Sequence, residues 1–108
     1  MGTGETCGSV LGGLMAIGLA LGPDTSRNPE RDVQVRIAAK AFVDSFIKTM
    51  GSTRCYEVQK AMVGWACDDP SKAGAWREAN GHVACAAVCG FAARLAAERI
   101  LDALDPLP

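Results

Sequence analysis

Apolar side chains recur every three or four residues along most of this 108-residue chain, and strong stop signals separate the stretches. The stop signals are Gly22-Pro23, Gly51, Asp69-Pro70 and Asn80-Gly81. No stretch shows the alternation of apolar and polar residues, rich in β-branched side chains, that indicates a strand. Apolar residues make up 49% of the chain, which is enough for one core without disulfides. We therefore expect an all-α fold, a small single domain over residues 1–108 with a bundle of about four to five helices.

The stop signals divide the chain into five predicted helices. They run from about Cys7 to Leu21, from Pro29 to Met50, from Ser52 or Thr53 through Trp65, around Trp76, and from about His82 to Leu104. The predicted N-caps of the first four helices are, in order, Thr6, Asn28, Ser52 or Thr53, and Asp69, because their side chains can accept from free helix N–H groups. Pro29 and Pro70 suit the first helical position, where no N–H donor is needed.

Spacing also predicts which faces are buried. Small residues recur every four positions in the first helix, which would let another helix approach closely along that strip; they are Gly8, Gly12, Ala16 and Ala20. Larger side chains cover its other sides, so this helix is expected to be buried on most faces; they are Leu11, Leu14, Met15 and Leu19. The expected core positions of the second and last helices are Val33, Ile37, Ala38, Ala41, Phe42, Phe46, Met50, Val88, Phe91, Leu95 and Leu101.

Net charge and the length of the apolar run argue against several partners and locations. The formal net charge of -1 gives no electrostatic case for binding nucleic acid or an anionic membrane. The apolar run from Val10 to Leu21 is too short and too rich in glycine to cross a bilayer, which needs about 20 apolar residues. No basic segment precedes that run, as one would in a secretory signal. The expected location is therefore the cytoplasm.

The chain contains five cysteines, an odd number, so at least one thiol is free, metal-bound or paired with another chain. In a reducing compartment, clustered cysteines indicate redox chemistry or metal binding more often than structural disulfides. Cys7 and Cys55 each fall in the first turn of a predicted helix. Helix N-termini carry partial positive charge, which favours thiolate over thiol. The alternative is that both are small buried hydrophobic residues.

Cys85 and Cys89 lie four residues apart on the last predicted helix. Their Cβ atoms would be about 5–6 Å apart, whereas a disulfide needs about 3.5–4.5 Å, so a shared metal is easier than a local disulfide. His82, one turn before Cys85, is a candidate ligand, proton donor or base, or simply a cap or surface residue. Cys67 is a weaker nucleophile, because the carboxylates that follow it oppose thiolate formation, but it can be a resolving thiol or a ligand.

Three segments carry a family resemblance. Residues 6–16 read TCGSVLGGLMA and continue to Gly18-Leu19, residues 51–58 read GSTRCYEV, and Cys85 is followed by Ala92-Ala93 and Leu95. In this order they resemble the motifs of the C_GCAxxG_C_C family of small helical proteins. The resemblance implies redox activity through shared cysteines, matched here by Cys7, Cys55 and Cys85.

The sequence departs from that family in two ways. Ser9 stands where the family usually has alanine, and the helix that carries the family's first cysteine is expected to be absent. The chain is then a fragment, or Cys67 or Cys89 replaces the missing thiol. An uncovered apolar face on the first helix would favour self-association or low stability.

The leading hypothesis is thiol-based redox chemistry, as a thiol oxidoreductase or electron carrier with a redox partner protein. Cys7, Cys55 and Cys85 would be the catalytic thiols, and Cys67, Cys89 and His82 would bind a cofactor, a metal ion or an iron–sulfur cluster, if one is present. One alternative is a metal or iron–sulfur module, which needs about four thiolates. Another is a structural helical module that forms a homo-oligomer through the Gly8, Gly12 and Ala16 strip.

Overall fold

A computed structural model describes residues 3–24 and 27–104 of the chain. These residues form α-helices and one 3₁₀ turn without a strand, which confirms the all-α prediction. The elements are α1 (Gly8–Leu21), α2 (Pro29–Met50), α3 (Cys55–Val63), η1 (Pro70–Lys72), α4 (Ala73–Glu78) and α5 (Gly81–Leu104).

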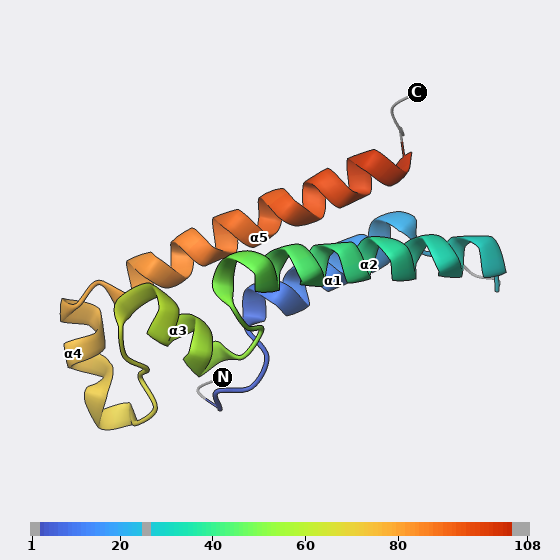
Figure 1. Cartoon of the computed structure of the whole chain (residues 1–108). Coiled ribbons are helices and arrows are strands. Elements are labelled where there is room, and N and C mark those ends of the chain that lie inside the picture. Colours follow the sequence, from blue (N-terminus) through green and yellow to red (C-terminus); the bar gives the residue numbers. More distant parts are fainter. Residues whose placement is uncertain (1–2, 25–26, 105–108) are drawn as a thin grey trace.

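The three longer helices pack side by side, and α3 and α4 lie at one end of them (Figure 1). The molecule is elongated, with principal extents of 47 × 29 × 17 Å. Helices α1, α2 and α5 share one hydrophobic core, to which α3 adds Val58. The buried side chains of that core are Val10, Ile17, Leu21, Ala38, Phe42, Phe46, Val58, Val88, Ala92 and Ala96.

Local signals placed most helix ends correctly. Asn28 Oδ1 accepts a hydrogen bond from the Arg31 N–H at 3.3 Å, which confirms the predicted cap of α2. Asp69 Oδ1 accepts one from the Ser71 N–H at 2.9 Å and caps the 3₁₀ turn η1, which leads into α4. The predictions for Thr6 and for Ser52 or Thr53 are wrong: the N-caps of α1 and α3 are Cys7 and Arg54, and no side chain caps either end. The third helix ends at Val63, earlier than predicted, because Gly64 adopts the left-handed conformation with φ of +97°.

The glycine that permits close packing in α1 is Gly13. A Cβ atom there would overlap the ring of Phe42, which is fully buried on α2. At Gly8 and Gly12 an added Cβ would meet no atom within 4 Å. The prediction that another helix approaches closely along the strip through Gly8 and Gly12 is therefore wrong within the chain. These two glycines face open space, whereas Gly13 contacts α2.

Several apolar residues predicted to be buried are exposed. Met15 and Leu19 of α1 are 68% and 86% exposed, and Ile37 of α2 is 66% exposed. Helix α1 packs mainly against α2 and α5, so Met15 and Leu19 lie on the side of α1 that these two helices leave uncovered. The other predicted core residues that are exposed are Leu11, Val33 and Leu101. Within the two described ranges, none of the helices combines the length and apolar character that a membrane span requires.

Candidate functional site

Two segments far apart in sequence meet directly before α1 and α3. Thr6 and Arg54 form an isolated antiparallel β-bridge. The Cys7 N–H donates to the Thr53 carbonyl at 2.7 Å, and the Cys55 N–H donates to the Glu5 carbonyl at 2.7 Å. These bonds hold the starts of the two helices together, in the region of Figure 1 where the N-terminal segment passes α3.

This short ladder places Cys7 and Cys55 close to each other. Neighbouring residues in an extended segment point to opposite sides, so both cysteines lie on the side opposite Thr6 and Arg54. They are diagonal neighbours across the ladder, for which Cα atoms are about 7–8 Å apart, so a disulfide between them requires a small movement of the backbone at one helix start. Cys7 is the N-cap of α1 and Cys55 is the first residue of α3, so each stands at a helix N-terminus, as the sequence predicts.

Cys85 of α5 lies within electrostatic reach of this pair. Burial raises the pKa of Cys85 above its ordinary value, and negative charge on Cys55, Cys7 and Cys89 raises it further. Helix α5 contacts both α1 and α3, which explains how a thiol 30 residues after Cys55 comes near it. All three thiols are half-buried. Charge on Cys7 acts on both Cys55 and Cys85, so these three cysteines lie within electrostatic reach of one another.

Burial also raises the pKa of Cys55, and negative charge on Cys7 adds to this effect. These two effects oppose the thiolate that the place of Cys55 at a helix N-terminus was expected to favour. A hydrogen bond from Gln59, at 3.5 Å between Nε2 and Sγ, acts in the opposite direction and lowers the pKa of Cys55. Because like charges repel, the Cys7–Cys55 pair holds one negative charge more readily than two.

Cys89 lies one turn after Cys85 and is exposed. Its sulfur accepts a hydrogen bond from the Ser9 hydroxyl of α1 at 3.2 Å. It lines a shallow apolar groove between α1 and α5, together with small residues that include Gly12 and Ala93. Cys89 is thus a solvent-exposed neighbour of Cys85 and does not belong to the half-buried Cys7–Cys55 pair.

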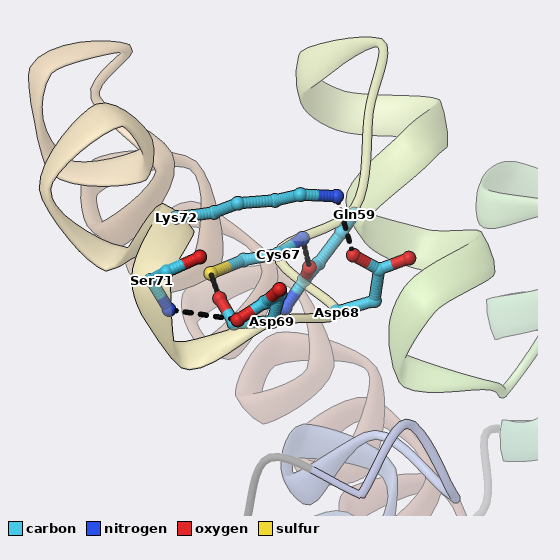
Figure 2. A network of polar contacts seen from close by, with 6 residues as sticks. All are labelled: Gln59, Cys67, Asp68, Asp69, Ser71 and Lys72. Atoms are coloured by element: carbon cyan, nitrogen blue, oxygen red, sulfur yellow. Dashed lines mark hydrogen bonds and ion pairs between the residues drawn. The ribbon is translucent and has the colours of Figure 1, made fainter.

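Cys67 lies between α3 and η1, in a turn rich in polar contacts (Figure 2). Its N–H donates to Gln59 Oε1 at 2.7 Å, and its thiol donates to the Asp69 carbonyl at 3.8 Å. Lys72 pairs with Asp68 at 2.8 Å in the same turn. Cys67 is therefore linked to Cys55 through hydrogen bonds of Gln59, which contacts the Cys67 backbone N–H and the Cys55 sulfur.

His82 is exposed in the first turn of α5, and its side chain makes no hydrogen bond or ion pair with another described residue. Its suggested roles as a ligand or a base for Cys85 stay predictions. Over residues 3–24 and 27–104, no group of three or more histidine, cysteine, aspartate or glutamate side chains is arranged to hold a metal ion. The metal and iron–sulfur alternative likewise stays a prediction.

The sequence analysis missed Gln59. The available signal was its position four residues after Cys55, since residues at that spacing share a helix face. The carbonyl end of Gln59 meets a backbone N–H from a distant turn, and a spacing pattern cannot reveal this contact.

Comparison with known proteins gives one match. Residues 1–99 match the family described as "Putative redox-active protein (C_GCAxxG_C_C)". No curated protein and no solved structure matches the chain.

Proposed function

We propose that this chain, which belongs to the C_GCAxxG_C_C family, carries out thiol–disulfide exchange with Cys7 and Cys55 as the exchanging pair and Cys85 as an adjacent third thiol. The observation that supports this most directly is the pair of backbone hydrogen bonds that joins Cys7 to Thr53 and Cys55 to Glu5. They hold two thiols on one side of a ladder, although 48 positions separate them in the sequence.

The proposed reaction needs a disulfide-bearing partner protein as the oxidant. The Cys7 thiolate attacks one sulfur of the partner's disulfide, forming a mixed disulfide and releasing the partner's other sulfur as a thiolate, which takes up a proton. The Cys55 thiol loses its proton and attacks the Cys7 sulfur of the mixed disulfide. The chain then holds the Cys7–Cys55 disulfide and the partner is a dithiol, so two electrons have passed to the partner.

The surroundings of the two sulfurs suit these unequal roles. Cys7 is the N-cap of α1, a helix of 14 residues, and its side chain makes no capping hydrogen bond. Burial and negative charge on Cys7 raise the pKa of Cys55, so the neutral thiol of Cys55 is favoured while Cys7 is charged. Formation of the mixed disulfide at Cys7 therefore makes the Cys55 thiol more acidic and prepares it to resolve the intermediate.

Disulfide mapping of the full chain tests the proposal. The reduced protein is oxidised with stoichiometric diamide, the remaining thiols are blocked at low pH, and the peptides are identified by mass spectrometry without reduction. The expected product links Cys7 to Cys55, and it should persist in Cys67→Ser and in Cys89→Ser, the matched controls. A dominant disulfide other than Cys7–Cys55 would refute the proposal.

The same preparation examines the metal alternative. Protein purified without oxygen is assayed for iron and zinc and for absorption in the visible range. Stoichiometric iron with a visible band that disappears in Cys7→Ser and Cys55→Ser would replace the dithiol proposal with an iron–sulfur site. Metal-free protein that still forms the Cys7–Cys55 disulfide is the result we expect.

A further inference from the structure

The amide of Gln59 has a defined orientation. The backbone N–H of Cys67 can only donate a hydrogen bond, so the Gln59 atom 2.7 Å from it must be the carbonyl oxygen Oε1. A flip of the amide would place two donors against each other. The Nε2 end therefore points to the Cys55 sulfur, 3.5 Å away, where it acts as a donor.

The turn that anchors Gln59 is itself held by several contacts (Figure 2). The Cys67 thiol donates to the Asp69 carbonyl, and the Asp69 carboxylate accepts from the Ser71 N–H at 2.9 Å. Lys72 pairs with Asp68 at 2.8 Å across the same turn. The acceptor end of Gln59 is thus fixed by a segment outside α3, which keeps its donor end on Cys55.

A donor at this position has a direct effect on the sulfur. A hydrogen bond to a thiolate is stronger than one to a thiol, so the contact favours the charged form of Cys55. It opposes the two effects that favour the neutral form, which are burial and negative charge on Cys7. Gln59 and Cys55 lie four residues apart on one helix, so the contact needs no movement of the backbone.

We propose that Gln59 is a positioning residue for Cys55: anchored by the Cys67 turn, it holds a hydrogen-bond donor on the sulfur that resolves the mixed disulfide. This inference rests on the proposed function for its role, and it assigns Cys67 a part as a backbone anchor rather than as a thiol. It predicts that the ionisation of Cys55 depends on the chemical nature of residue 59 and not only on its size.

Two variants separate this role from simple packing. In Gln59→Glu, one carboxylate oxygen can still accept from the Cys67 N–H, while the other places negative charge against Cys55. In Gln59→Met, a side chain of similar length keeps the packing but has no donor. Gln59→Glu should raise the pKa of Cys55 by about one unit and Gln59→Met by about half a unit. The chain's other glutamine, Gln34 on α2, provides the control Gln34→Glu.

The readout is the rate at which each cysteine of the reduced full-length chain is alkylated by iodoacetamide between pH 6 and 10, measured peptide by peptide with exposed Cys89 as internal reference. At pH 8, alkylation of Cys55 should be about threefold slower in Gln59→Glu, since a lower thiolate fraction is partly offset by higher nucleophilicity. Gln34→Glu should leave it unchanged. Unchanged pH profiles of Cys55 in both Gln59 variants would overturn the inference.

This experiment does not depend on disulfide formation. If Cys55 shifts as expected but oxidation never links it to Cys7, the proposed function fails and the contact itself stands. If the disulfide forms while Cys55 ionises identically in every Gln59 variant, the proposed function stands and the assignment of Gln59 fails.

Discussion

Two adjacent glycines of α1 give a matched test of how this helix packs. Gly12→Ala and Gly13→Ala make the same chemical change at neighbouring positions inside one helix, so the gain in helix propensity, about 1 kcal/mol, is the same for both. At Gly12 the added Cβ meets no atom within 4 Å, whereas at Gly13 it overlaps the ring of Phe42, which is 0% exposed.

The difference between the two variants therefore isolates the cost of overpacking. Such costs are about 1–3 kcal/mol, and the upper part applies here because a buried aromatic ring cannot move aside easily. We expect Gly12→Ala to raise the free energy of unfolding by about 1 kcal/mol and Gly13→Ala to lower it by about 2 kcal/mol. Urea denaturation of the reduced proteins, followed by far-UV circular dichroism, measures both values.

Equal stability of the two variants would refute this reasoning. It would mean that α1 does not approach α2 through Gly13, and that the predicted strip through Gly12 is as close to a neighbour as Gly13 is. A Gly13→Ala variant with unchanged slope of unfolding free energy against urea, but a lower midpoint, would localise the effect to the native state.

Three further predictions concern stability. Asn28→Ala should cost about 1 kcal/mol in urea denaturation, because the Arg31 N–H loses its acceptor; no loss would show that the cap is dispensable. Ile17 is 0% exposed, so Ile17→Ala should lower the free energy of unfolding by about 2–5 kcal/mol. Leu19 is 86% exposed, so Leu19→Ala should change it by less than about 0.5 kcal/mol. The reverse order would contradict the burial of α1. The pKa values of Cys55 and Cys85 are raised in the folded chain, so the unfolded chain ionises first and stability should fall as pH rises above the ordinary value of 9.0. Thermal melts of the reduced protein should show this loss, and a Cys55→Ser, Cys85→Ser double variant should show less of it.

The parts of the fold that depend on neighbouring residues could be predicted from the sequence. Asn28 followed by proline, and Asp69 followed by proline, specify helix starts through contacts within three residues. The exposed side of a helix could not be predicted in this way. Leu19 and Ile37 have the spacing of core residues, but burial depends on whether another helix covers that side, which the spacing does not encode.

The candidate site also combines features set by neighbouring residues with features set by contacts between distant segments. The position of Cys55 at a helix start follows from the nearby stop signal at Gly51, whereas the predicted cap Thr6 does not cap the helix that follows Cys7. Their proximity depends on hydrogen bonds between residues 5–7 and 53–55, and backbone pairing of two short segments leaves almost no sequence signature. The family resemblance indicated Cys7, Cys55 and Cys85 without showing how they meet.

A redox titration of the full-length chain tests the central claim most directly. The protein is equilibrated with mixtures of oxidised and reduced glutathione, quenched with acid, and the Cys7–Cys55 peptide is quantified by mass spectrometry. We predict one reversible transition with the slope of a two-electron couple, about 30 mV per tenfold change, carried by that peptide alone and unchanged in Cys67→Ser. A transition carried by another pair, or only by bonds between chains, would contradict the account.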